Sequence, residues 1–268
     1  MSLEKLKLGC VTNSDSTYAV SIKNALCKKY NIQEVSLSAP LLAEKYNVIV
    51  VLGGDGFMIR AMHGYIGHKV VFYGINCGTL GFLMNSFDVA KDCLLEKINN
   101  AVNTDLKLIR VKAHMDNGLS VNVCAINEAA LLRETIQTVH IKVSINRKCH
   151  LNCLIGDGIM LSTPSGSAAY NFSAGGPILP LKSNLFALTP ISPFRPRRWR
   201  GALLPQDVSV TFEVLDSNKR PANLFIDYKS FPSIRLVELS LCEPGLLNVL
   251  FDNGHELENR IINEQFLH

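Results

Sequence analysis

The sequence predicts an amino-terminal doubly wound α/β domain followed by a β-rich carboxyl-terminal domain. Over the first hundred residues, apolar runs rich in β-branched residues alternate with helical patterns, which is typical of parallel strands covered on both faces. After about residue 105, short apolar runs, many of them alternating, are separated by turn residues, and no long helical pattern comes between them. We therefore place the first domain at residues 1–104 and the start of the second at residue 105.

Strands and helices alternate in the first domain. The apolar run Asn47–Leu52 is the clearest buried strand, and it ends in a glycine-rich turn. Further strands are expected at Lys7–Thr12 and Lys69–Ile75, and helices at Ser16–Lys29 and Phe57–His63.

The second domain is predicted mainly from strands. They are expected at Leu106–His114, Leu119–Asn127, Val139–Ile145 and Val208–Val214. The sequence Asp116-Asn117-Gly118 favours a hairpin turn between the first two of them. The final segment Glu256–Phe266 could form a helix.

Composition excludes several classes of protein. Of the 268 residues, 47% are hydrophobic and 19% are charged, as in ordinary globular proteins rather than disordered ones. The formal net charge of +4, from 27 basic and 23 acidic residues, is too small to indicate a nucleic-acid binder by itself. No stretch reads as a membrane span, and the first residues lack a signal-peptide core.

The cysteine and histidine patterns argue against disulfides and zinc. The 8 cysteines are scattered without a Cys-x-x-Cys pair, so we interpret them as reduced thiols of a cytoplasmic protein. The 7 histidines show no His-x-x-x-His pair, and we expect no metal site built from protein side chains.

The first candidate site is the turn Gly53-Gly54-Asp55-Gly56 that follows the clearest strand. Glycines let a ligand approach the backbone amides, and free N–H groups at the start of a helix suit phosphate. An aspartate there needs a chemical task, such as accepting a proton, and Arg60 lies one helical turn further on, where it could reach phosphate. The alternative is a tight turn in which Asp55 caps a helix. The turn matches neither the dinucleotide fingerprint nor a Walker loop.

Two shorter motifs are further candidates. Gly74–Leu83 carries three glycines after a strand, which suggests backbone opened for a ligand or a loop that needs positive φ. Asn127-Glu128 combines an amide with a carboxylate, which suits paired hydroxyls such as those of a ribose. A solvated strand end is the alternative for this pair.

The segment Gly156–Pro177 is the longest candidate. Small and hydroxyl-bearing residues surround Tyr170, and Asp157 is its one charged residue, a composition unusual for a plain loop. Tyr170 could stack on an aromatic base, and Asp157 could accept a hydrogen bond from a sugar hydroxyl or an adenine amino group.

The segment Arg195–Arg200 places four arginines around the single tryptophan of the chain. Such a segment would suit nucleic acid or phosphates. An exposed loop or a subunit contact is the interpretation that we favour, because no second basic patch supports the first one.

In their order and spacing, these motifs resemble the NAD kinase family. The similarity runs from about Val48 to about Asp227. The Gly-Gly-Asp-Gly turn by itself is shared with phosphofructokinases and lipid kinases, whereas the segment Asp157–Pro177 narrows the choice.

The resemblance implies transfer of phosphate from ATP to the 2′-hydroxyl of the adenosine ribose of NAD, giving NADP and ADP. Mg²⁺ or another divalent cation would arrive with ATP. The partners implied are NAD and ATP, with no nucleic acid and no membrane, in a homodimer or homotetramer. The resemblance also implies a β-rich dinucleotide-binding domain at residues 105–240, a tail at 241–268 that packs back on the first domain, and an active site between the domains.

The family's motifs also imply roles for individual residues. Asp55 matches the proposed proton acceptor, and Gly54, Gly56 and Arg60 match positions near phosphate. The residues implied to bind NAD are Asn127, Glu128, Asp157, Ala168, Ala169, Tyr170, Asn171, Phe172 and Ser173.

The chain departs from the family pattern at several positions. Ser165 and Ala168 stand where threonine is common, so a hydroxyl is absent at 168. Ile155 stands where an arginine is often found, and Tyr228-Lys229 replaces the Gly-Gln that often follows the aspartate at 227. These departures bear on substrate preference more than on the reaction.

Two other functions fit parts of the pattern. A lipid or sugar kinase could use the same glycine turn, although a lipid kinase would need an apolar entry for acyl chains and Ser162–Ser173 is small and polar. A regulatory module could sense NAD or NADP without catalysis, although such a module would gain from losing a carboxylate next to phosphates.

Overall fold

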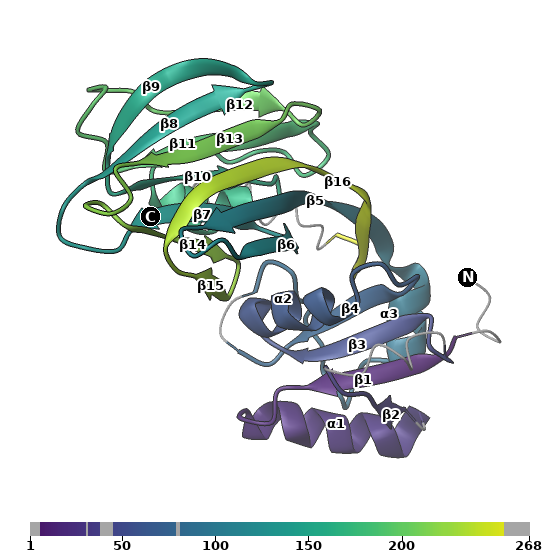
Figure 1. Cartoon of the computed structure of the whole chain (residues 1–268). Helices are drawn as coiled ribbons and strands as arrows, with labels where there is room; N and C mark the ends of the chain where they lie inside the picture. Colours follow the sequence, from purple (N-terminus) through teal and green to yellow (C-terminus); the bar gives the residue numbers. More distant parts are fainter. Residues whose placement is uncertain (1–5, 31, 38–44, 79–80, 255–268) are drawn as a thin grey trace. The chain divides into compact units, whose positions relative to one another are not determined.

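The computed structural model describes residues 6–30, 32–37, 45–78 and 81–254, apart from the side chains of residues 244–246 (Figure 1). The chain divides into two compact units. Unit 1 consists of Met1–Leu106 together with Pro244–His268, and unit 2 consists of Lys107–Glu243. The predicted domain limits at 104 and 240 stay a prediction beside these divisions.

Unit 1 is built on a parallel sheet. Its strands lie in the order β2 (Gln33–Glu34), β1 (Leu8–Thr12), β3 (Val48–Gly53) and β4 (Val71–Asn76). The last part of β16 (Ile234–Phe251) adds a further parallel neighbour, because Asn248 pairs with Val71. Every residue of β3 is buried, which is why this strand is a continuous apolar run.

The described residues of unit 1 also form the helices α1 (Thr17–Tyr30), α2 (Asp55–Gly64) and α3 (Leu94–Asn100). The core contains Ile22 and Leu26 of α1, Leu94 of α3, and Leu250 of β16. Because residues near both ends of the chain enter one core, unit 1 is discontinuous in sequence. No described helix is long and apolar enough to cross a membrane.

Unit 2 contains two sheets. One contains the first part of β16, followed by β13 (Val210–Leu215), β8 (Val139–Ile145) and β9 (Lys148–Gly156). The other runs β12 (Ala202–Pro205), β11 (Leu185–Ile191), β10 (Gly158–Ser162), β7 (Glu128–Arg133), β14 (Ala222–Ile226) and β15 (Lys229–Phe231). One apolar core is shared by residues of both sheets, including Phe212 of β13 and Phe186 of β11. The result is a sandwich of two antiparallel layers.

The structure confirms the predicted change from α/β to β architecture. The predicted hairpin is present: β5 (Val102–Met115) pairs with β6 (Ser120–Ala125), and the Gly118 amide donates to the Met115 carbonyl. Several boundaries differ from the prediction by one to four residues, and the largest difference is at β5, which begins at Val102 rather than at Leu106. The strand predicted to run to Asn127 ends at Ala125, and the helix predicted from Phe57 begins at Asp55. The predicted helix Glu256–Phe266 lies outside the described residues.

Candidate active site

In unit 1, the glycine-rich turn joins β3 directly to α2. Gly54 is the N-cap of α2, with extended φ and ψ of −118° and −176°, and Asp55 is the first helical residue. A Cβ added at Gly54 or at Gly56 would meet nothing within 4 Å among the described atoms. Neither internal packing nor a positive φ therefore requires glycine at these two positions. Space for an external group against the backbone is the property that glycine provides there.

The Asp55 carboxylate is held by the backbone of a second segment of unit 1. Its two oxygens accept hydrogen bonds from the Phe82 N–H at 2.7 Å and the Leu83 N–H at 2.9 Å. A Cβ at Gly81 would lie 3.2 Å from the Asp55 carboxylate and 2.9 Å from Met84 Cγ, so close approach requires glycine at 81. The structure thus brings the two glycine motifs of the first domain together around one oriented carboxylate.

Arg60 lies on α2 beyond this turn and is exposed. Its predicted contact with phosphate stays a prediction. In the described part of the chain, no group of three or more His, Cys, Asp or Glu side chains is placed to hold a metal ion.

In unit 2, the segment 162–166 packs against the backbone that carries Asn127. The hydroxyls of Thr163 and Ser165 both donate to the Ile126 carbonyl, at 2.7 and 3.1 Å. A Cβ at Gly166 would lie 2.3 Å from the Asn127 carbonyl oxygen, so glycine is required for this approach. These contacts therefore join two motifs that lie about 35 residues apart in the sequence.

Glu128 opens β7 and is 9% exposed. Burial, and next the negative charge of Asp227, raise the pKa of its carboxyl group to about 8. Among the described residues, its buried Oε2 atom has no hydrogen-bond partner. With its pKa raised to about 8, this carboxyl group is protonated at neutral pH and can donate or accept a hydrogen bond, and a ligand hydroxyl would supply the missing partner.

Asp157 forms the turn between β9 and β10. Its carboxylate accepts from Nε of Arg133 at 2.6 Å, and its carbonyl accepts from the Arg133 N–H at 2.8 Å. Sequence reasoning missed Arg133, although it is the first basic residue after Glu128. Arg133 is the last residue of β7. Its neighbour Leu132 pairs with Gly158 of β10, and only this strand register reveals that Arg133 lies beside Asp157.

The predicted ligand segment 168–173 contains the end of a short 3-10 turn, η3 (Gly166–Ala168), and a single helical turn, α4 (Tyr170–Ser173). Tyr170 is 39% exposed, and Phe172 is 46% exposed. Partial burial and the charges of Glu128 and Asp157 raise the pKa of the Tyr170 phenol. Tyr170, Glu128 and Asp157 therefore lie within electrostatic range of one another, and an exposed part of the ring is available to a ligand.

Other members of this segment differ in exposure. Ala168 is half-buried, whereas Ala169 and Ser173 are exposed. Asn171 is fully buried: its amide N–H groups donate to the carbonyls of Ser167 and Pro177, and its Oδ1 accepts from Thr189 at 2.6 Å. These bonds give Asn171 a role in holding the turn, and its predicted contact with NAD stays a prediction.

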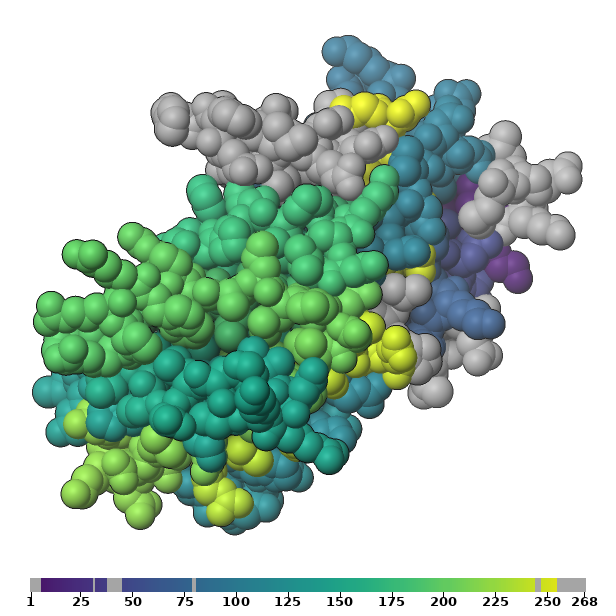
Figure 2. Space-filling view, turned by 90° about the horizontal axis from the view of Figure 1, so that it is seen from above, coloured from purple at the N-terminus to yellow at the C-terminus, as the bar shows by residue number. Residues whose placement is uncertain are grey.

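The arginine-rich segment joins the edge of β9. The carbonyl of Ile155 accepts from the amides of Phe194 and Arg195, and the guanidinium groups of Arg195 and Arg197 lie 5.5 and 5.7 Å from the Phe194 ring centroid. Phe194 is exposed, and Figure 2 shows in green the surface that this part of the chain forms on one face of unit 2. Elsewhere in unit 2, the Lys229 amino group lies 5.5 Å from the centroid of the Tyr228 ring.

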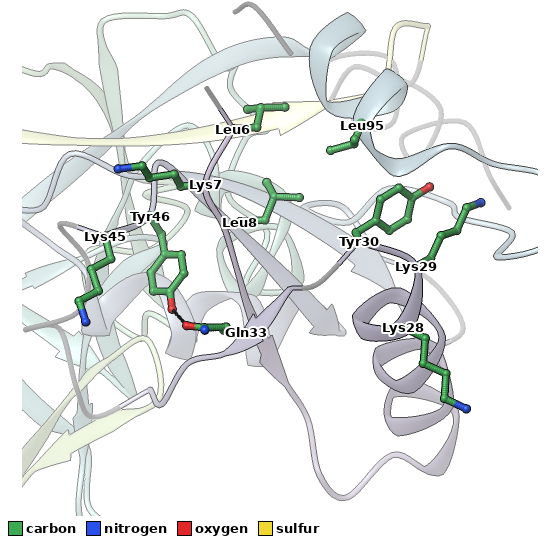
Figure 3. Close-up of a pocket in the computed structure, with 10 residues that line it drawn as sticks. All are labelled: Leu6, Lys7, Leu8, Lys28, Lys29, Tyr30, Gln33, Lys45, Tyr46 and Leu95. Carbon is green, nitrogen blue, oxygen red and sulfur yellow. Dashed lines mark hydrogen bonds between the residues drawn. The ribbon is translucent and has the colours of Figure 1, made fainter. Parts of the chain in front are cut away.

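A surface pocket of about 880 Å³ lies elsewhere in unit 1 (Figure 3). Its lining includes Lys7, Lys28, Lys29 and Lys45, whose amino groups point in different directions and do not converge. None of the predicted site residues lines this pocket. We therefore do not assign the site to it.

Comparison with known proteins identifies the fold. The chain superposes on a crystal structure of yeast NADH kinase complexed with NADH with a TM-score of 0.79 at 18% identity, covering 97% of this chain and 87% of that one. An NAD kinase from Archaeoglobus fulgidus in complex with ATP gives a TM-score of 0.75 at 20% identity, covering 96% and 97%. At this identity the likeness concerns the fold alone.

Sequence relatives identify the family. The NAD kinase of Rickettsia bellii is 40% identical over 260 residues, which are 97% of this chain and 98% of that protein. The NAD kinase of Xylella fastidiosa is 43% identical over 223 residues, which are 83% and 85% of the two chains. The family model of the ATP-NAD kinase C-terminal domain matches residues 126–230. The chain belongs to the NAD kinase family, and the predicted resemblance is confirmed.

Proposed function

We propose that this protein transfers the terminal phosphoryl group of ATP to the 2′-hydroxyl of the adenosine ribose of NAD, giving NADP and ADP. Family membership over nearly the whole chain supports this reaction. The structural observation that carries it is the Asp55 turn, where glycines at 54 and 56 leave the backbone open beside a carboxylate fixed by two amides.

Phosphoryl transfer depends on positioning and charge neutralisation more than on covalent chemistry. In the proposal, the backbone at Gly54 and Gly56 faces the donor's phosphates, with the start of α2 as an additional favourable partner for negative charge. A divalent cation such as Mg²⁺ accompanies ATP and neutralises part of its charge. Asp55 orients the acceptor hydroxyl and receives its proton late, as the new bond forms, because an ordinary carboxylate is a weak base towards an alcohol.

The acceptor is bound by unit 2 in this proposal. Asn127 and Glu128 offer an amide and a buried carboxyl group to the ribose hydroxyls, and Tyr170 offers a partly exposed ring to a base. Asp157, fixed by Arg133, provides a further acceptor. Ala168, Ala169, Phe172 and Ser173 would contribute contacts along the same segment.

The deciding experiment is to incubate the purified protein with NAD, ATP and Mg²⁺ and to detect NADP with a dehydrogenase that accepts only NADP. We expect NADP to form in proportion to enzyme and time. Absence of NADP would contradict the proposal and would leave a sensing module or a kinase for another alcohol. Repeating the assay with NADH and with polyphosphate defines the acceptor and donor ranges.

Assembly and location complete the proposal. We propose a cytoplasmic homodimer or homotetramer, as the family resemblance implies. Light scattering coupled to size-exclusion chromatography measures the mass of the assembly, and a mass of one chain would contradict this part.

A further inference from the structure

The peptide groups of Ile126, Asn127 and Glu128 are hydrogen-bonded on both sides. On the carbonyl side, the Ile126 oxygen accepts from the hydroxyls of Thr163 and Ser165. The Asn127 oxygen accepts from the Thr163 N–H at 2.9 Å and from the Ser162 hydroxyl at 3.2 Å. This short connection between β6 and β7 is therefore fixed along its carbonyl face.

The N–H side of the same three residues faces one carboxylate. The Asp227 Oδ2 atom accepts from the Ile126 N–H at 2.8 Å, and Oδ1 accepts from Asn127 at 2.8 Å and from Glu128 at 3.3 Å. The Asp227 N–H in turn donates to the Glu128 carbonyl at 3.2 Å. A residue about 100 positions away thus binds all three amides of the connection.

The local fold explains how Asp227 reaches this place. It occupies the two-residue turn between β14 and β15, where Ile226 pairs with Lys229, and its φ of 51° lies in the left-handed region. Aspartate tolerates this conformation better than most residues. Because Ile226 also pairs with Ala129 of β7, the sheet register sets the turn beside the start of β7.

We propose that Asp227 is a positioning residue for dinucleotide binding, which acts by orienting the backbone from which the Asn127 and Glu128 side chains project. This inference rests on the proposed function, because Asn127 and Glu128 bind the dinucleotide in that proposal. Asp227 itself need not touch the ligand. Hydrogen bonds to a charged acceptor are roughly twice as strong as those between neutral groups, so this carboxylate fixes the connection more firmly than a neutral side chain would.

The charge of Asp227 has a second effect on the same site. Together with burial, it raises the pKa of the Glu128 carboxyl group. Within the described part of the chain, the titratable groups in electrostatic contact with Glu128 are Asp227 and, on α4, Tyr170. Replacing Asp227 with a neutral residue therefore lowers the pKa of Glu128, an effect that lost packing alone would not produce.

The central test is Asp227→Asn, which keeps the size of the side chain but replaces one acceptor oxygen with an NH₂ group that opposes a backbone N–H. We expect the KM for NAD to rise at least about tenfold, because a neutral amide forms weaker hydrogen bonds with the three backbone N–H groups than the charged carboxylate does. The KM for ATP should remain unchanged, and kcat at saturating NAD should fall less than KM rises. NMR titration of the Glu128 carboxyl carbon should show a lower pKa in the variant.

Asp216→Asn is the matched control. Asp216 also sits in a turn of unit 2 with a positive φ, 55°, but its side chain is exposed, and no described backbone N–H donates to its carboxylate. We expect this variant to bind NAD as the wild type does.

Several outcomes would overturn the inference. Asp227→Asn with a wild-type KM for NAD would do so, as would equal losses for NAD and ATP or a fall in kcat alone. If Asp227→Asn does not fold, hydrogen exchange in the wild type decides. Protected amides at 126, 127 and 128 support the hydrogen bonds to Asp227, and rapidly exchanging amides refute them. Failure of the proposed function is a different result, namely a wild-type protein that makes no NADP. In that case hydrogen exchange still tests the hydrogen bonds between Asp227 and the amides of residues 126 to 128.

Discussion

At the scale of single residues, the clearest feature is that one carboxylate is fixed at the start of α2. Asp55 accepts from two amides of the 81–83 segment, so its orientation is set before any ligand binds. Preorganised groups save the entropy of orientation during reaction. The chemistry proposed for the whole protein depends on this side chain.

Replacing Asp55 with asparagine removes the proton acceptor and keeps the shape of the side chain. We expect turnover to fall by roughly 10² to 10⁴, the usual contribution of a general base, while the dissociation constant for NAD changes little. Steady-state kinetics and calorimetry measure the two quantities. Turnover near that of the wild type would remove Asp55 from the mechanism.

Tyr170 is expected to act through its ring. Tyr170→Ala should weaken NAD binding by about 1–3 kcal/mol, which is typical of the loss of a base-stacking contact. Tyr170→Phe is the control, since it keeps the ring and removes the hydroxyl. An unchanged dissociation constant in the alanine variant would contradict stacking.

Glu128 makes stability depend on pH. Its pKa is raised from 4.5 to about 8, so the folded state holds a proton that the unfolded chain releases between these values. Folding stability from this group is complete below pH 4.5 and is lost as pH rises through 8, by at most about 1.4 kcal/mol per pH unit.

Glu128→Gln should abolish this dependence, so the variant gains stability relative to the wild type from pH 5 towards pH 8. Urea unfolding at several pH values measures the difference. The exposed Glu134→Gln is the control, and it should follow the wild type. Parallel curves for the Glu128 variant and the wild type would contradict the assignment.

At the scale of elements, glycines serve two different purposes in this fold. At Gly166, a Cβ would enter the Asn127 backbone, at 2.3 to 2.5 Å from its atoms. At Gly56 within α2, a Cβ would meet no described atom within 4 Å. The first glycine therefore permits internal packing, and the second leaves space outside the fold.

Gly166→Ala should destabilise the protein by about 1–3 kcal/mol, as expected when a packed region is overfilled, and should weaken NAD binding. Gly56→Ala should leave stability unchanged or improve it by up to about 1 kcal/mol, because alanine favours helices, while it lowers activity. Thermal unfolding together with the kinase assay separates the two variants. Equal loss of stability in both would refute the distinction.

At the scale of the whole molecule, residues near both ends of the described chain pack into the core of unit 1. Asp252 accepts from the Tyr73 hydroxyl at 2.7 Å and from Lys97 Nζ at 2.7 Å, and its N–H donates to the side chain of the buried Asn85. These bonds join the residue after β16 to β4, to α3 and to the segment after β4. Folding of unit 1 therefore depends on the end of β16, a strand that begins in unit 2.

Asp252→Ala should cost about 1–3 kcal/mol, because it leaves a buried hydroxyl and a partly buried ammonium group without this partner. Denaturant unfolding measures the change. Asp15→Ala, at an exposed position of the same unit, should stay within about 0.5 kcal/mol of the wild type. A stable Asp252→Ala protein would show that these bonds do not hold the unit together.

Local sequence was sufficient for the features that depend on neighbours in the chain. The buried strand before Gly53, the hairpin at Asp116–Gly118 and the α/β-to-β transition all follow from hydrophobic period and turn chemistry. The order and spacing of the motifs were sufficient for the family. Asp55, Glu128 and Tyr170 were all named from sequence, although not their surroundings.

Tertiary structure alone decided which distant residues support these side chains. Arg133 binds Asp157 across 24 residues, and Asp227 reaches the 126–128 amides across about 100. Both contacts arise where antiparallel strands are placed in register, and register is set by the packing of whole sheets rather than by any local pattern. For this reason chemistry could be predicted from the chain, while its positioning required the fold.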